Sequence, residues 1–299
     1  MKMPTLPRHT TLRVISILLV LPLTKLFPNA FAWQTFVFSL GFSHYAMALY
    51  YSKHQAARVL GQPSSYLPLV IITVLGGALY WRSFSLVLYF AAHHMFNEVY
   101  LMKYSNRVES HPGISRLRTS SLLLNLFVYL VILRDHRDVR FLDPMMLYDG
   151  LALSIISFVY CLMSVRPSMT RHELADASAF ELIGLLLVGL SFFTPITFLQ
   201  IVCYHFAFWI VYPMKKIRAG GNWRLAGYLG WTAGLTAFFF ALSPIGALRL
   251  PLVAPHFSSQ FMMWSYIHIT ISYALSASHP GWITRWFKPR QAIPSSALS

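Results

Sequence analysis

The sequence predicts an all-α integral membrane protein, a polytopic bundle of eight to ten transmembrane helices in a single domain that covers residues 1–299. Hydrophobic residues make up 56% of the chain and charged residues only 11%, whereas soluble domains carry about 25% charged residues. The apolar residues form long blocks, and lysine and arginine collect in the short loops between them. Membrane proteins place their basic residues in this way.

The first apolar block, Val14–Leu23, follows a polar and basic segment, 1–13, that we expect to be cytoplasmic. Two interpretations of residues 14–32 are open. Ala30-Phe31-Ala32 fits a signal-peptide cleavage site, so the block could be a cleaved signal, or it could be a first span. We favour a first span, because polytopic proteins often use an uncleaved first segment as their signal.

Nine further apolar blocks are candidate spans. Several are closer to 15 residues than to the ~20 that a spanning helix requires, so some of them could be re-entrant or tilted segments. The polar tail, 285–299, is expected to lie outside the membrane. In chain order the blocks are 31–51, 66–80, 84–102, 120–133, 147–163, 180–193, 195–213, 225–242 and 260–277.

The distribution of basic residues predicts the topology. If all ten blocks span and the N-terminus is cytoplasmic, 18 lysines and arginines lie on the cytoplasmic side and 6 on the other. This asymmetry predicts that both termini are cytoplasmic, and we expect a bacterial inner membrane. The formal charge of +15 follows from this topology. We expect no nucleic-acid binding, since the basic residues form no continuous stripe.

Small and polar residues occur in some of the other blocks. Gly230 and Gly234 have a spacing that permits close helix contact, although glycine is also simply common in membrane helices. Glu181 stands near the end of its block, and we expect it at the membrane interface. Asn125 lies well inside its span.

Five histidines lie near the middle of four even-numbered blocks. These blocks run in the same direction, so a rise of 1.5 Å per residue places the imidazoles near one depth. Neutral imidazole is the commonest metal ligand. We therefore predict a metal site formed by His44, His94, His205 and His268, with His93 as the alternate to His94. Six further histidines fall in loops or near block ends and are expected to be solvated or interfacial: His9, His54, His111, His136, His172 and His256.

Residues 89–102, YFAAHHMFNEVYLM, add a carboxylate at the same level. His94 and Glu98 are four residues apart and share a helix face. Glu98 could ligate the metal, orient a ligating imidazole, or act as a catalytic acid or base. A few imidazoles with one carboxylate and open positions suit iron that activates O₂, so we favour Fe(II) over Zn(II).

Three short motifs stand out around the central histidines: SLVLYFAAHHMFNEVYL, GFSHYAMAL and CYHFAFW. They resemble motifs of the Brp/Blh family of membrane-bound carotene-cleaving dioxygenases. In the first motif His94 matches the family's histidine and Glu98 its acid, the second resembles an early motif with His44, and the third resembles a later one with His205. The chain departs from the later motif at Trp209, where the family has a second histidine. The resemblance implies iron held by histidines and an oxygenase acting on a polyene.

The sequence therefore favours a histidine-ligated membrane metal enzyme, an oxidoreductase or dioxygenase that acts on a lipid-soluble substrate drawn from the surrounding lipids. Two other classes are open: a haem-binding electron-transfer protein, because facing histidines can hold haem, and a transporter with a histidine proton relay. An inverted repeat would favour the transporter, and we find none in the sequence. The oligomeric state is open.

Overall fold

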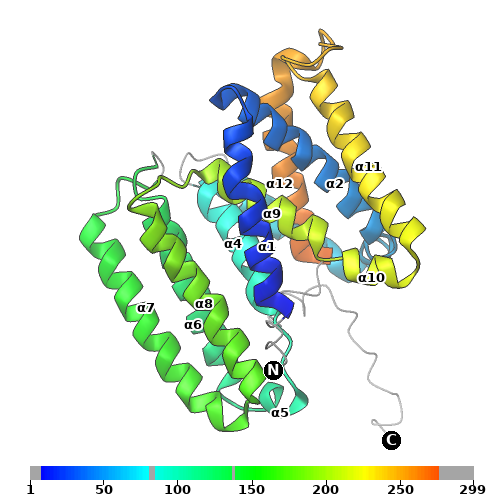
Figure 1. Cartoon of the computed structure of the whole chain (residues 1–299). Coiled ribbons are helices and arrows are strands. Elements are labelled where there is room, and N and C mark those ends of the chain that lie inside the picture. Colours follow the sequence, from blue (N-terminus) through cyan, green and yellow to red (C-terminus); the bar gives the residue numbers. More distant parts are fainter. Residues whose placement is uncertain (1–7, 81–84, 137–138, 276–299) are drawn as a thin grey trace, which may run out of the picture.

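The computed structural model describes residues 8–80, 85–136 and 139–275. Over these ranges the regular elements are all α-helices or 3₁₀ helices and no strand occurs, which confirms the predicted all-α fold (Figure 1). Each of the ten apolar blocks overlaps one α-helix of the described ranges. The helices are α1 (Arg8–Leu23), α2 (Ala30–Leu60), α3 (Tyr66–Tyr80), α4 (Ser85–Leu101), α5 (Asn106–Glu109), α6 (Ile114–Ile132), α7 (Pro144–Val165), α8 (Arg171–Ser191), α9 (Phe198–Val211), α10 (Met214–Ala219), α11 (Asn222–Leu242) and α12 (Phe257–Leu275).

Within the described ranges, five helical stretches are long and apolar enough to cross a membrane. They belong to α1, α6, α7, α8 and α11, and α3 is a shorter apolar helix. The chain is thus a multi-pass membrane protein. The helices that carry the central histidines, α2, α4, α9 and α12, are shorter or more polar. The five stretches are His9–Leu26, Ile114–Ile132, Pro144–Ser168, Arg171–Ser191 and Asn222–Leu242.

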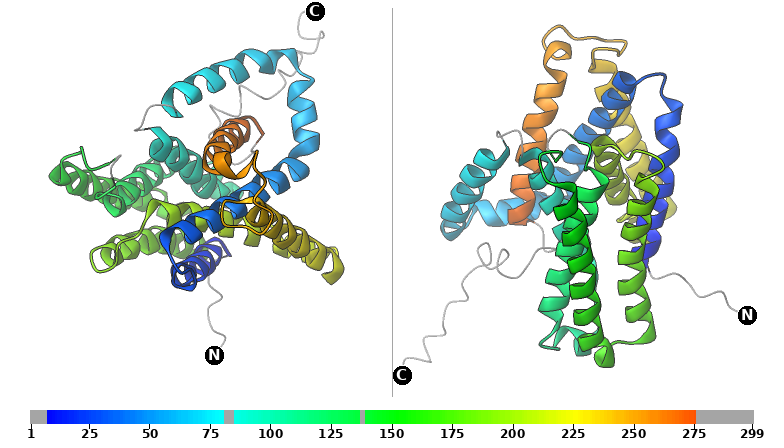
Figure 2. Two further views of the ribbon diagram at one scale, coloured as in Figure 1. Left: turned by 90° about the horizontal axis from the view of Figure 1, so that it is seen from above. Right: turned by 90° about the vertical axis from the view of Figure 1, so that its left-hand side faces the viewer.

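The chain passes back and forth between two ends of the bundle (Figures 1 and 2). The α1–α2, α6–α7, α8–α9 and α11–α12 connections lie toward the upper end in Figure 1, and the α7–α8 and α10–α11 connections lie toward the other. Helices α2, α4, α9 and α12 consequently run in the same direction, so their midpoints can lie at one depth.

Local sequence signals explain where several helices begin. The Asn29 side chain accepts a hydrogen bond from the Ala32 amide at 2.8 Å and caps α2. Thr170 and Thr197 form capping boxes with Glu173 and Gln200 at the starts of α8 and α9. These side chains satisfy amide groups that a helix start leaves without partners. They therefore fix the residues at which α2, α8 and α9 begin.

Helices α6, α7 and α8 form one side of the molecule, at the left in Figure 1. Here α6 packs on both α7 and α8. The outer face of α7 exposes large apolar side chains, among them Leu153, Ile156 and Tyr160. An exposed apolar face of this size would be a liability in water, and it is the surface that a lipid-facing helix requires.

The start of the chain differs from the sequence expectation. We expected residues 1–13 to form a polar cytoplasmic segment, but α1 already begins at Arg8. His9, Thr10 and Arg13 are buried, so the expected solvation of His9 is wrong. The reason is that α1 packs against α8 and α9 and turns these polar side chains inward.

One other expectation about the spans is wrong, and the structure decides between two alternatives that the sequence left open. Glu181 is 3% exposed inside the bundle, not at its surface, because Ser121 and Asn125 of α6 donate hydrogen bonds to it. Gly230 and Gly234 face open space, with nothing in the described structure within 4 Å of an added Cβ atom. They are therefore ordinary small residues of α11 and not a close helix contact.

Candidate metal centre

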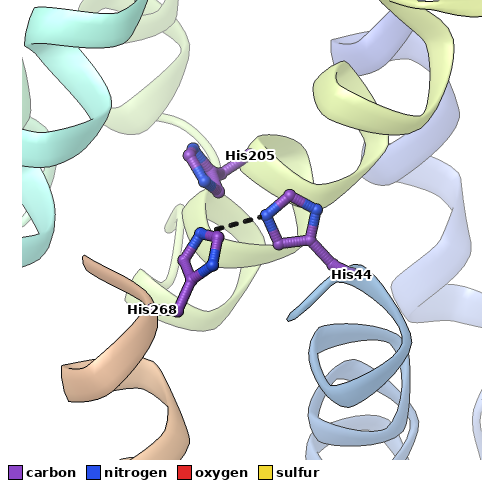
Figure 3. Close-up of side chains that lie close together, drawn as sticks. All are labelled: His44, His205 and His268. Atoms are coloured by element: carbon purple, nitrogen blue, oxygen red, sulfur yellow. Dashed lines mark hydrogen bonds between the residues drawn. The ribbon is translucent and has the colours of Figure 1, made fainter. Parts of the chain in front are cut away.

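Three of the predicted ligands come together from three helices: His44 of α2, His205 of α9 and His268 of α12 (Figure 3). One ring nitrogen from each lies within 4.8 Å of the others. His44 and His205 are buried and His268 is half-buried. We call these three residues the histidine centre.

The geometry fits a bound metal ion. Metal–imidazole bonds are about 2.0–2.1 Å long, so two ligands of a tetrahedral ion lie about 3.4 Å apart. The Nε2 atoms of His44 and His268 are 3.3 Å apart. The nitrogens of the full set lie within 4.8 Å of one another, so a movement of up to about 1.4 Å would bring all three to that spacing.

The packing around His44 explains why α2, α9 and α12 meet at this point. Gly41, one turn before His44, would place an added Cβ atom 2.9 Å from the Phe206 ring of α9. On α12, the ring of His268 stacks on Tyr45 at 4.8 Å. The Tyr45 hydroxyl pairs with Ser265 Oγ at 2.7 Å. A side chain at position 41 would therefore separate the helices that supply the imidazoles.

His94 and His93 of α4 lie beside the histidine centre and not within it. His94 Nδ1 is 2.9 Å from His205 Nδ1. If His205 donates this bond, its Nε2 keeps a lone pair for a metal, which is the usual arrangement of a ligating histidine. His93 faces Ser272, whose Oγ lies 2.7 Å from its Nδ1.

Glu98 lies on the side of His94 that faces away from the histidine centre. Its carboxylate accepts a hydrogen bond from the Tyr204 hydroxyl, and its Oε1 is 3.7 Å from His94 Nε2. That nitrogen makes no hydrogen bond to any described residue. Glu98, His94 and His205 thus form a row that leads to the histidine centre, and Glu98 is positioned to orient His94 rather than to touch the three imidazoles.

Sequence reasoning missed a second buried cluster, which we call the carboxylate centre: Arg13, Glu98, Asn125 and Glu181. Arg13 is 3% exposed; it lies 3.9 Å from Glu98 Oε2 and donates to Asn125 Oδ1 at 3.2 Å. Asn125 Nδ2 donates to Glu181 Oε2 at 2.9 Å. The signal in the sequence was Asn125 and Glu181 within apolar blocks; Arg13 had been assigned to the preceding segment.

A cavity of about 400 Å³ opens beside the histidine centre. His93, His205 and His268 line it, together with aromatic rings of α2, α4, α9 and α12. Small-molecule sites are typically apolar cavities of about 300–1,000 Å³ with a few convergent polar groups. A smaller cavity of about 60 Å³ lies beside Arg13 and Tyr204 and does not reach the three imidazoles.

Comparison with protein families, with curated proteins and with solved structures finds no match for this chain. The resemblance to the Brp/Blh family therefore stays a prediction from three short motifs, and the function is argued from the geometry of the site.

Proposed function

We propose that this protein is a membrane-embedded metal enzyme, an O₂-dependent oxidoreductase whose metal ion is held by His44, His205 and His268. The observation that carries the proposal is the convergence of three imidazoles from three helices at the end of an apolar cavity. A lone histidine in a membrane helix commonly hydrogen-bonds a neighbouring helix. Three at one point exceed that need and supply lone pairs toward one position.

Fe(II) is favoured over Zn(II) as the resident ion. Zinc in catalytic sites takes three protein ligands of this kind and activates a bound water. The histidine centre is largely buried beside a mostly apolar cavity, where such a water is less favoured. Iron held by histidines with open positions would supply O₂-activating chemistry. His94 would hold His205 in the ligating tautomer, and Glu98 would orient His94, as carboxylates do behind metal-bound histidines.

The proposed substrate is lipid-soluble and reaches the cavity from the surrounding membrane lipids. We propose further that both chain termini face the cytoplasm of a bacterial inner membrane, following the basic-residue asymmetry. Haem is the less favoured cofactor. A haem iron takes at most two axial protein ligands, one on each side of the macrocycle, whereas His44 and His268 contact each other directly at 3.3 Å.

Elemental analysis and an absorption spectrum of the purified protein test the proposal. We expect about one iron per chain, no intense haem band, and loss of the iron in His205→Ala. His172→Ala serves as the matched control, because His172 is exposed on α8 and should leave the iron content unchanged. A metal-free protein after expression in iron-supplemented medium, or an intense haem band, contradicts the proposal.

A further inference from the structure

The cavity beside the histidine centre follows one face of α2. Gln34, Phe38 and Tyr45 line it at helical spacing, so they share that face. From Gln34 to the level of His44 is ten residues, or about 15 Å along the helix. The walls are aromatic: Phe38 of α2 stacks on Phe261 of α12 at 4.0 Å. The cavity is thus an elongated space with imidazoles at one end.

The lining carries no fixed charge. Of the described residues that line the cavity, none is aspartate, glutamate, lysine or arginine. Burying a charged group without a partner costs many times more than burying a hydrogen-bonded neutral one. Among these described residues, an ionised head group would meet no side chain with a permanent opposite charge.

Side chains that can form hydrogen bonds gather at the other end. Gln34 lies near the start of α2, His136 follows α6, and Thr197 caps α9. All three belong to the end of the bundle at which α2 and α9 begin (Figure 1). Gln34 brings an amide donor and acceptor, which suits a hydroxyl or carbonyl group.

The loops at that same end expose large apolar side chains. Leu26, Phe193 and Leu252 are 75%, 87% and 85% exposed on the α1–α2, α8–α9 and α11–α12 connections. Apolar side chains that are exposed in this way suit contact with membrane lipid. A molecule dissolved in the lipid therefore has an apolar approach to the mouth.

We propose that the cavity binds an uncharged, chain-like molecule with a hydroxyl or carbonyl head, the head at Gln34 and His136 and the apolar end at the imidazoles. At about 30 Å³ per water-sized group, 400 Å³ accommodates roughly 13 such groups. Dodecanol has this size. The inference rests on the proposed function only for the chemistry at the imidazoles; binding itself requires no metal.

Photo-crosslinking tests this directly in the purified full-length protein. The probes are dodecanol and dodecanoate, each with a diazirine at the chain end. Both are used at a pH at which the carboxyl group of dodecanoate is ionised. We expect the alcohol to label residues that line the cavity on α4, α9 and α12, and the acid to label them at least about tenfold less, which corresponds to 1.4 kcal/mol. Excess unlabelled dodecanol should suppress the labelling, and excess dodecanoate should not.

Leu199→Trp and Leu182→Trp form the matched pair of variants. Leu199 lines the cavity one and a half turns from His205, so a tryptophan there should block the alcohol's labelling. Leu182 is 56% exposed on α8, and its variant should label like the wild type. Equal labelling by the acid, or labelling that survives both Leu199→Trp and excess dodecanol, contradicts the inference.

Metal content measured on the same preparations separates the two claims. Specific labelling by the alcohol in a metal-free protein contradicts the proposed function and supports the cavity assignment. Metal bound in full without specific labelling supports the proposed function and contradicts the cavity assignment.

Discussion

The bundle buries two polar clusters that differ in how their groups are satisfied. In the carboxylate centre, Arg13 stands among two carboxylates, an amide and a backbone carbonyl: it donates to Phe180 O at 2.8 Å and to Asn125 at 3.2 Å. The histidine centre consists of three imidazole rings that each bring a nitrogen within 4.8 Å of the others. Its nearest support is His94, whose Nε2 lies 3.7 Å from Glu98 Oε1 of the first cluster.

The difference indicates what each cluster is for. A buried ionic network in which the charged groups have counter-charges and hydrogen bonds holds a particular arrangement of helices together, and breaking it is costly. A convergence of donor atoms beside an apolar cavity leaves room for something else to complete the set. We therefore assign the carboxylate centre to stability and the histidine centre to function, with Glu98 as the residue that links them.

The largest expected effect is on stability. Arg13→Met leaves two buried carboxylates without their cation, and removing one partner of a buried ion pair costs about 3–5 kcal/mol. We expect a large fall in melting temperature of the detergent-solubilised protein. Arg171→Met is the control, because Arg171 is exposed at the start of α8. Equal melting of the two variants would place the carboxylate centre outside the stabilising interactions.

Metal removal should have the next largest effect on stability. A ligand that binds only the folded state stabilises it by about 2.7 kcal/mol at a concentration of 100 times Kd. Chelation should therefore lower the melting temperature of the wild type and of Glu181→Gln, but leave His205→Ala unchanged. Similar responses of the wild type and His205→Ala to the chelator would show that the stabilising metal is not held by the histidine centre.

Glu98→Gln sharpens the comparison at the link between the clusters. Substitution of a residue that orients a metal ligand typically lowers the metal affinity by about 10–100-fold. Metal titration of Glu98→Gln should therefore show weaker binding that is still complete at saturation. Glu181→Gln removes a charge from the same cluster without a contact to His94, and its metal affinity should match the wild type. If both variants weaken binding equally, the effect is one of general stability and not of the row from Glu98 to His205.

The smallest expected effect is the difference between alanine substitutions at two glycines, Gly41 and Gly230. Gly41→Ala should push Phe206 away from α2, lowering stability and, because His44 is one turn away, metal affinity. Gly230→Ala faces open space and should be neutral or stabilising by up to about 1 kcal/mol. Thermal melting of both variants checks this, and a stable Gly41→Ala with full metal affinity would contradict the packing account of the site.

Composition and block lengths predicted the helices, because a membrane chain must satisfy its backbone within each helix. The direction of the even-numbered blocks anticipated that His44, His205 and His268 would lie together. The sequence did not separate these three from His93 and His94, since that depends on how far α4 is rotated against its neighbours. It missed the inward face of α1, because an arginine at the start of an apolar block reads equally as a loop residue.

The central claim is that three imidazoles hold the metal, and X-ray absorption at the metal edge of the purified protein measures this most directly. The account predicts nitrogen ligands at about 2.0–2.2 Å with the outer-shell scattering of about three imidazole rings, reduced by one ring in His268→Ala. A metal without imidazole scattering, or with a signal unchanged in His268→Ala, would contradict the account.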